Sequence, residues 1–212
     1  MLGDVLLIER KHEDAAKTIL ERVLKEKKEK YIVAISGESG SGKTELAHVL
    51  AKLLKKEGIR AKPLHSDNYY KVSPLERIEW RKQQGFESIG YTEYDWETIN
   101  RNIREFKEGK KATMPCIDIV TDQLDTLITD FKDVDMLIID GLYAIKTEGV
   151  DLRVFIELTY HETKKAQILR GKEPQNEYRM KVLQKEHEVV QSLKPLADLL
   201  VNMEYKVVDA KS

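Results

Sequence analysis

Short apolar runs alternate with amphipathic stretches along the chain, and this alternation predicts an α/β fold. The buried-strand type of run, rich in β-branched and aliphatic residues, occurs at residues 31–35, 136–140, 154–158 and 199–201. A further strand is expected over residues 58–67, ending at Asp67, and residues 112–117 are expected to form a short edge strand.

Between these runs, apolar residues recur at intervals of three and four, which predicts helices. The expected helices cover residues 14–30, 46–54, 96–108, 161–170 and 177–193. Asp95 has the position of an N-cap and Gly109 that of a helix-ending glycine. Strands that alternate with helices favour a mainly parallel, doubly wound sheet, which binds ligands at the carboxyl ends of its strands.

The pattern predicts one main domain over residues 31–212, preceded by a helical extension, residues 1–30, that packs on it. The connection 71–94 is unusually long and broken by Pro74, Gly85 and Gly90, although residues 75–84 have helical spacing. Long connections in compact domains are usually functional, so this segment is expected to lie on the substrate side. A lid region is expected at about 161–180.

The charge balance argues against a nucleic-acid or membrane partner. Lys and Arg number 36 and Asp and Glu 37, and no apolar run approaches the roughly 20 residues of a membrane helix. The first residues lack the basic segment of a signal peptide, and the single cysteine, Cys116, suits a reducing compartment. These features predict a cytoplasmic protein.

Residues 37–44 read GESGSGKT, a complete Walker A loop between an expected strand and an expected helix. Glycines let successive backbone N–H groups turn toward phosphates, and the helix N-terminus adds partial positive charge. Lys43 would reach the β- and γ-phosphates, and the Thr44 hydroxyl would bind Mg²⁺. The expected nucleotide-binding residues are Gly37, Glu38, Ser39, Gly40, Ser41, Gly42, Lys43, Thr44 and Glu45.

Three further elements carry candidate chemistry. Asp140 ends an apolar strand, as a Walker B acid that helps hold Mg²⁺ does, although such an acid can also cap a strand end. Asp67 either orients an acceptor hydroxyl toward the γ-phosphate or caps a turn. Arg170, Lys172 and Arg179 surround Gly171 and Pro174, and they are either lid cations that neutralise the transferring phosphoryl group or solvated surface.

In this order, these elements resemble the uridine kinase and phosphoribulokinase group of P-loop kinases. The matching segments are residues 36–44, 66–70, 115–118, 139–141, 168–170 and 196–201. The resemblance implies a P-loop NTPase fold, a three-layer sandwich of the nucleoside-kinase type, that uses ATP and Mg²⁺ to phosphorylate a hydroxyl of a small molecule. It also implies that Asp67 acts on the acceptor hydroxyl, that Tyr70 and Asp118 lie in the acceptor site, that Asp140 belongs to the metal region, and that Arg170 lies in the lid helix.

Four positions depart from the uridine kinase pattern. Ile117 replaces an aromatic residue, residues 121–123 replace a stretch with a histidine, residues 88–92 replace a Phe-Asp-His-Pro-like segment, and Gln167 replaces an arginine. These positions mainly recognise the nucleoside, so their loss weakens base binding. Uridine or cytidine is the default acceptor; a sugar, sugar phosphate or pantothenate-like alcohol is the rival. Arg77, Arg81 and Lys82 would hold an anionic acceptor, or they are exposed charges on a short helix.

Two other hypotheses stay open from the sequence. A P-loop switch or motor ATPase is disfavoured, because the chain has neither an Asn-Lys-x-Asp segment nor a Leu-Ser-Gly-Gly-Gln-type signature. A kinase fold that binds nucleotide without catalysis is the other. Related kinases are often oligomeric, and a homo-oligomer is therefore an expectation of the resemblance alone.

Overall fold

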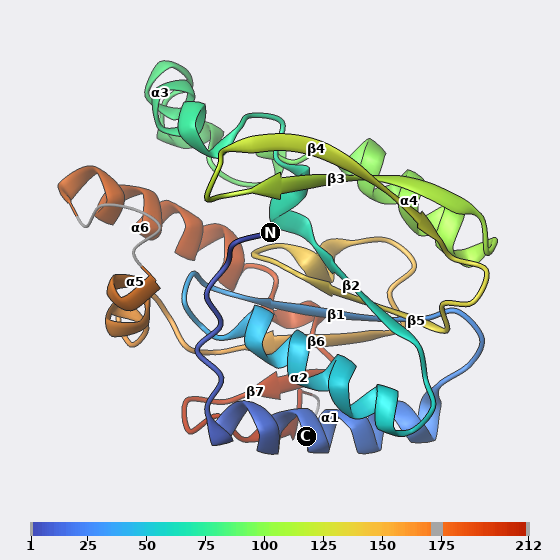
Figure 1. Ribbon diagram of the computed structural model, residues 1–212. Helices are drawn as coiled ribbons and strands as arrows, with labels where there is room; N and C mark the ends of the chain where they lie inside the picture. Colours follow the sequence, from blue (N-terminus) through green and yellow to red (C-terminus); the bar gives the residue numbers. More distant parts are fainter. Residues whose placement is uncertain (1, 171–175, 211–212) are drawn as a thin grey trace.

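The computed structural model describes residues 2–170 and 176–210, which form a sheet covered by further layers on both faces (Figure 1). In this part of the chain, the main sheet has six strands in the order β2-β5-β1-β6-β7-β8, all parallel except the last. Its strands are β1 (Tyr31–Gly37), β2 (Ala61–His65), β5 (Met136–Asp140), β6 (Leu152–Ile156), β7 (Leu199–Val201) and β8 (Val207–Asp209). The expected three-layer α/β fold with a mainly parallel sheet is confirmed.

Helices pack against both faces of the sheet. Their bounds are α1 (Arg10–Glu26), α2 (Lys43–Lys56), α3 (Pro74–Gln84), α4 (Trp96–Lys107), α5 (Lys164–Arg170) and α6 (Glu177–Gln191). A separate antiparallel pair, β3 (Lys111–Asp118) and β4 (Gln123–Asp130), packs beside α4. Among the described residues, no helix is long and apolar enough to cross a membrane.

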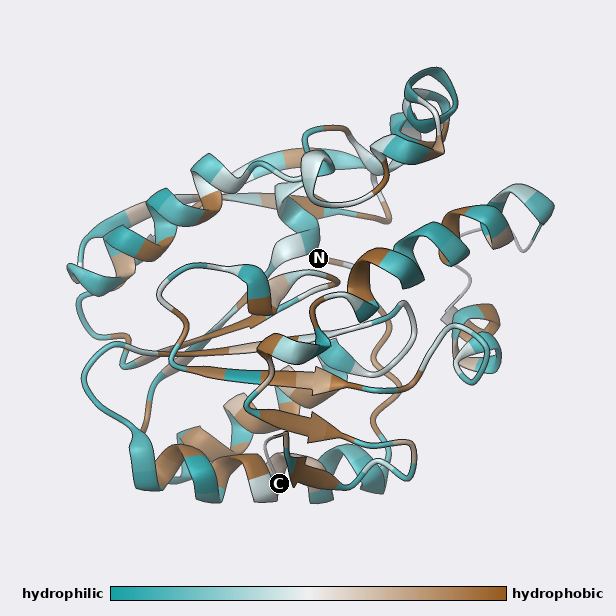
Figure 2. Ribbon diagram, turned by 180° about the vertical axis from the view of Figure 1, so that it is seen from behind, coloured by the Kyte–Doolittle hydropathy of each residue, from teal (hydrophilic) through white to brown (hydrophobic). Residues whose placement is uncertain are grey.

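Strand β1 is buried on both faces, which explains its continuous apolar run. Tyr31, Val33 and Ile35 face a core shared with α1 and α2, whereas Ile32 and Ala34 face a core shared with α4 and β3. Hydrophobic residues therefore concentrate on the strands and the inward sides of the helices, with polar residues outside (Figure 2). This double burial places the loop after β1 at the centre of the carboxyl edge of the sheet.

Several predicted elements differ from the observed ones. The first helix begins at Arg10 rather than at residue 14, because His12 forms part of its cap. Residues 112–117 do not form an edge of the main sheet; they pair with β4, which was not predicted. Strand β4 is exposed along almost its whole length and buries no face that would give it a periodic signal. Strand β8, three residues long, was also missed.

The first helix contacts the Walker A loop through His12. The His12 side chain is buried, and the backbone N–H of Glu9 donates to its Nδ1 over 2.9 Å. A Cβ added at Gly42, whose φ is +94°, would lie 2.6 Å from His12 Nε2 and 2.5 Å from the Tyr205 hydroxyl. The N-terminal helix and the C-terminal β7–β8 turn thus close around this glycine. The division of the chain at residue 30 stays a prediction.

A buried charge network fastens the 71–94 connection to α6. Arg81 of α3 donates to both carboxylate oxygens of Glu93, over 2.6 and 3.0 Å, and to Glu186 of α6 over 3.1 Å. All three residues are at most 5% exposed. Buried carboxylates need such partners, because each would otherwise lose its hydration without compensation.

The burial of His12 predicts a pH dependence of stability. Burial lowers the pKa of His12 below 6.5, with Lys11 adding to the effect and Glu45 opposing it. The unfolded chain therefore takes up a proton at a higher pH than the folded chain, and stability is lost as the pH falls through about 6.5. Urea unfolding should give a lower free energy at pH 5.5 than at pH 7.5, with a shallower decline in His12→Asn.

The control is His161→Asn, which changes an exposed histidine and should keep the wild-type decline. If the free energy of unfolding declines equally with pH in all three proteins, His12 is not the source of the pH dependence.

Removing Arg81 should destabilise the fold strongly. Arg81→Met leaves Glu93 and Glu186 buried without their cation, which typically costs about 3–5 kcal/mol. Lys82→Met on the same helix removes an exposed charge and should change the free energy of unfolding by less than about 0.5 kcal/mol. Urea unfolding at neutral pH measures both; similar stability of the two variants would show that the network contributes little.

Candidate active site

The Walker A loop has the backbone shape that phosphate binding requires. It connects β1 to the first residue of α2, and Gly40 and Gly42 have φ values of +78° and +94°, which favour glycine. The ammonium group of Lys43 donates to the backbone carbonyl of Glu38 over 2.8 Å, so it is folded back over the loop. Because backbone N–H groups at a helix N-terminus bind anions, the residues present fit a nucleotide triphosphate.

Asp140 joins three elements at the carboxyl edge of the sheet. Thr44 Oγ1 donates to Asp140 Oδ2 over 2.8 Å, and His65 Nδ1 lies 2.6 Å from Asp140 Oδ1. Burial by itself would raise the pKa of Asp140, but His65, the Thr44 hydrogen bond and the Lys43 charge outweigh it and lower that pKa. The carboxylate therefore stays ionised at neutral pH.

A hydroxyl beside an ionised carboxylate is a donor set that suits Mg²⁺, a hard cation that prefers oxygen ligands. The structure holds no group of three or more His, Cys, Asp or Glu side chains fit for a metal within the ranges that it describes. Thr44 and Asp140 would therefore share the ion with phosphate oxygens and water, as is common for Mg²⁺ in kinases. Sequence reasoning missed His65, which reaches Asp140 because β2 pairs with β5 and the last residues of the two strands are in register.

Asp67 lies at the same edge of the sheet. It follows β2 in a short 3₁₀ helix, Ser66–Tyr69, and its half-exposed carboxylate accepts a hydrogen bond from the Tyr94 hydroxyl over 3.3 Å. A Cβ added at Gly141 would lie 1.7 Å from Ser66 Oγ and 3.8 Å from Asp67 Oδ1. Glycine after Asp140 thus lets the segment that carries Asp67 approach the end of β5.

The Glu38 side chain is held by protein groups from two other elements. Its Oε1 accepts from Gln191 Nε2 over 2.6 Å and lies 2.7 Å from His187 Nδ1, and its Oε2 accepts from the Tyr160 backbone N–H over 2.7 Å. Glu38 is 2% exposed. Its carboxylate therefore anchors the loop to α6 and to the connection after β6. These partners were not predicted, because no sequence motif marks them.

The lid side meets the loop at Ser39. Thr163 Oγ1 and Gln167 Nε2 donate to the Ser39 carbonyl over 2.7 and 3.2 Å, and Arg179 Nη2 donates to Ser39 Oγ over 3.4 Å. Arg179 also pairs with Glu186, over 3.7 Å. Arg179 is thus brought to the Walker A loop. The Arg170 side chain and residues 171–175, including Lys172, lie outside the described part of the chain.

The other residues predicted to bind the acceptor, Tyr70 and Asp118, have contacts of their own. The ring of Tyr70 is 4.2 Å from that of Tyr94, so Tyr70 neighbours the partner of Asp67. Asn68 Oδ1 accepts from the Ile117 backbone N–H over 3.3 Å, which brings the β3–β4 hairpin to the same place. Asp118 Oδ1, however, accepts from the backbone N–H groups of Val120 and Thr121 and thereby shapes the hairpin turn.

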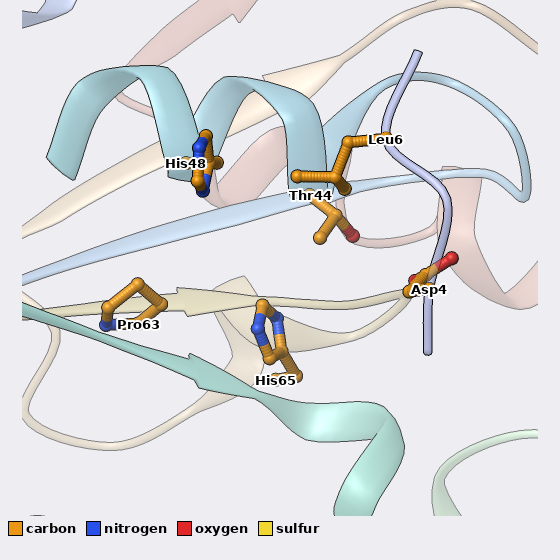
Figure 3. Close-up of a pocket in the computed structure, with 6 residues that line it drawn as sticks. All are labelled: Asp4, Leu6, Thr44, His48, Pro63 and His65. Atoms are coloured by element: carbon orange, nitrogen blue, oxygen red, sulfur yellow. The ribbon is translucent and has the colours of Figure 1, made fainter. Parts of the chain in front are cut away.

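The N-terminal segment runs past this edge of the sheet. It pairs with β3 through Leu2 and is tied to α2 by a 3.1 Å hydrogen bond from the Leu7 N–H to Glu45 Oε1. It covers a cavity of about 110 Å³ beside Thr44 (Figure 3), which is lined by Asp4, Leu6, Thr44, His48, Pro63 and His65. The Glu45 carboxylate thus contacts the N-terminal segment.

Comparisons with known proteins identify the family. The family model described as phosphoribulokinase/uridine kinase matches residues 32–167. A protein of Ureaplasma parvum described as uridine kinase is 30% identical over 153 residues, 68% of this chain and 70% of that protein. A Staphylococcus aureus protein with the same description is 28% identical over 134 residues, 59% of this chain and 61% of that protein.

Solved structures agree at the level of the fold. A Bacillus stearothermophilus protein described as a possible uridine kinase superposes with a TM-score of 0.65 at 24% identity, covering 88% of this chain and 97% of that one. Phosphoribulokinase from Rhodobacter spheroides gives a TM-score of 0.63 at 13% identity, covering 81% of this chain and 69% of that one. With its Walker A loop inside the matched segment, this chain belongs to the phosphoribulokinase/uridine kinase family of P-loop kinases.

Proposed function

We propose that this protein transfers the γ-phosphate of ATP to a hydroxyl of a small molecule, with Mg²⁺ as cofactor. The observation that carries the proposal is the junction at Asp140, where the Thr44 hydroxyl donates to the carboxylate over 2.8 Å. Asp67 directly follows the neighbouring strand, β2, in the short 3₁₀ helix Ser66–Tyr69. Donor, metal and acceptor groups thus meet at one edge of the sheet, as phosphoryl transfer requires.

Each side chain has a distinct role in this proposal. Lys43 leaves the Glu38 carbonyl to bind phosphate oxygens, and the loop N–H groups from Gly37 to Thr44 hold the rest of the triphosphate. Thr44 and Asp140 hold Mg²⁺, which offsets negative charge on the phosphates. Asp67 accepts a hydrogen bond from the acceptor hydroxyl and aims its oxygen at the γ-phosphorus. Arg179, beside Ser39, neutralises charge as the lid closes, together with Arg170.

The acceptor is either a pyrimidine nucleoside or another small alcohol. Uridine and cytidine come first, because the relatives are described as uridine kinases. The hairpin supports the alternative. Ile117 stands where the family usually has an aromatic residue, and it is 2% exposed, so it offers no face for a base. Asp118, a predicted acceptor ligand, uses its Oδ1 within the hairpin turn.

The first test is ADP release from Mg-ATP in the presence of separate alcohols: uridine, cytidine, pantothenate, pentoses and sugar phosphates. Release that depends on one acceptor supports a kinase. Slow release that no alcohol accelerates supports the ATPase hypothesis, and Mg-ATP binding without turnover supports a catalytically inactive fold. Either of the last two results overturns the proposal.

Lys43→Ala should abolish transfer while the fold persists. Its ammonium group contacts a loop carbonyl in this structure and charge on phosphates during turnover, so its loss removes little native packing. ADP release should fall to background, with far-UV circular dichroism unchanged. Lys52→Ala, an exposed change later on the same helix, is the control and should behave as wild type. Normal turnover in Lys43→Ala would refute the Walker A assignment.

Asp67→Asn should lower kcat by roughly 10²–10⁴-fold, the range for a positioned proton-transfer group. The amide keeps the size of the carboxylate, and the Tyr94 hydroxyl retains an acceptor. The affinity for Mg-ATP should stay the same, because the Walker A contacts are untouched. Exposed Asp133→Asn is the matched control. A kcat within a few-fold of wild type would mean that Asp67 is structural and that another group orients the acceptor.

A further inference from the structure

Several buried polar groups that lack a hydrogen-bond partner belong to residues linked to Asp67 by sequence or by ring contacts. Among the residues that the structure describes, Ser66 Oγ, the Tyr143 hydroxyl, and Nε and Nη2 of Arg77 are buried and bind no other group. Native proteins leave few such groups, and each calls for an explanation. A ligand that supplies the missing partners explains these groups.

These groups connect to Asp67 through a chain of aromatic rings. Ser66 directly precedes Asp67, and the Tyr143 ring lies edge-on to the Tyr94 ring at 5.4 Å, while the Tyr94 hydroxyl donates to Asp67. On the other side, the Tyr70 ring contacts that of Tyr94, and the guanidinium carbon of Arg77 lies 3.4 Å from the centre of the Tyr70 ring. The Arg77 guanidinium is therefore two ring contacts away from the tyrosine that holds Asp67.

Arg77 differs sharply from the other arginine on α3. Arg81, one helical turn later, is neutralised by Glu93 and Glu186. Arg77 makes no ion pair within the described ranges, and its guanidinium stacks on the Tyr70 ring. Stacking fixes the plane of the guanidinium and leaves its N–H groups directed along that plane. A planar fork of donors held in this way matches a carboxylate or a phosphate.

We propose that Arg77 binds an anionic group of the phosphate acceptor, so that the acceptor is a small alcohol that carries a carboxylate or a phosphate. This inference rests on the proposed function and narrows its substrate class. In the reaction, the bond from the γ-phosphorus to the ADP oxygen breaks, and a bond to the acceptor oxygen forms. The hydroxyl proton leaves by way of Asp67 to solvent, and the products are ADP and a phosphorylated anion.

The arrangement gives each end of the acceptor a separate partner. The hydroxyl that reacts lies at Asp67, and the anionic group lies at Arg77 on α3, whose Ile78 carbonyl accepts a hydrogen bond from the Tyr178 hydroxyl of α6 over 3.3 Å. Positive charge at Arg77 also offsets the repulsion between an anionic acceptor and the triphosphate. A neutral nucleoside would leave this cation without a partner.

The first experiment compares matched acceptors, each a neutral alcohol and its anionic derivatives. The pairs are glycerol with glycerate and with glycerol phosphate, ribose with ribose phosphate, and uridine with uridine monophosphate. ADP release from Mg-ATP should be at least about 10-fold more efficient, by kcat/KM, with an anionic member, which is the effect of one charge-assisted contact. Comparing glycerate with glycerol phosphate separates a carboxylate from a phosphate.

The second measurement uses variants of α3. Arg77→Met should raise the KM for the best anionic acceptor roughly 10–100-fold, with kcat and the KM for ATP nearly unchanged. Arg77→Lys keeps the charge but loses the planar fork, so its KM for the anionic acceptor should lie between those of wild type and Arg77→Met. Lys82, which the sequence also offered for an anionic acceptor, is instead exposed and pairs with Glu79 at the surface, so Lys82→Met should match wild type.

A third measurement reads binding without turnover. With the Walker A loop filled by a non-hydrolysable ATP analogue and Mg²⁺, inorganic phosphate should raise the thermal unfolding midpoint of wild type and of Lys82→Met, but not that of Arg77→Met. An absent shift in wild type overturns the inference, as does a neutral alcohol as best acceptor with an unchanged KM in Arg77→Met. If the protein transfers phosphate to neutral alcohols only, the proposed function holds and the inference about Arg77 is wrong. If the protein does not bind the ATP analogue, both the proposed function and the inference are wrong.

Discussion

The buried carboxylate of Asp140 is the point on which the architecture of the site depends. It stays charged because the Thr44 hydroxyl and the His65 imidazole both contact it, and these come from α2 and β2. Removing water from a carboxylate is costly unless such partners compensate, so the end of β5, the start of α2 and the end of β2 are held in one arrangement. The Walker A loop and the segment that carries Asp67 each begin next to this junction, and their relative position follows from it.

Polar side chains of helix α6 connect the Walker A loop to the 71–94 connection. His187 and Gln191 contact the Glu38 carboxylate of the Walker A loop. Glu186, next to His187, accepts a hydrogen bond from Arg81 of the 71–94 connection. Arg179 extends from the same helix to Ser39. A shift of α6 on ligand binding would therefore move donor-side and acceptor-side groups together. Loops held by a few buried ion pairs keep defined positions although they bury little apolar surface.

Much of this arrangement could be predicted from the sequence where its pattern reflects backbone geometry. The apolar run 31–35 and the glycines that follow gave the central strand and the phosphate loop, because burial on both faces and positive φ values leave clear marks. Strand β4 left none, since it is paired but exposed. His65, His187 and Gln191 were missed for another reason: each acts through one long-range contact, which only the folded register brings together. The surroundings of Arg77 were missed because they depend on the stacking of Arg77 on Tyr70 and of Tyr70 on Tyr94. Such contacts between separate segments leave no periodic pattern in the sequence.

The contrast between features set by backbone geometry and features set by single side chains has a consequence for the family. Family membership constrains the phosphate-binding loop more tightly than the residues proposed to bind the acceptor. The triphosphate site is built largely from backbone N–H groups and a helix terminus, so any chain that keeps the glycines and the fold keeps the site. The proposed acceptor site is built from side chains on a hairpin and on a long connection, where single substitutions change its shape and charge without disturbing the sheet. Ile117 removes an aromatic face, Arg81 is committed to structure, and Arg77 retains an unneutralised charge beside Tyr70. A P-loop kinase scaffold can thus change the molecule it phosphorylates while its phosphate chemistry stays the same.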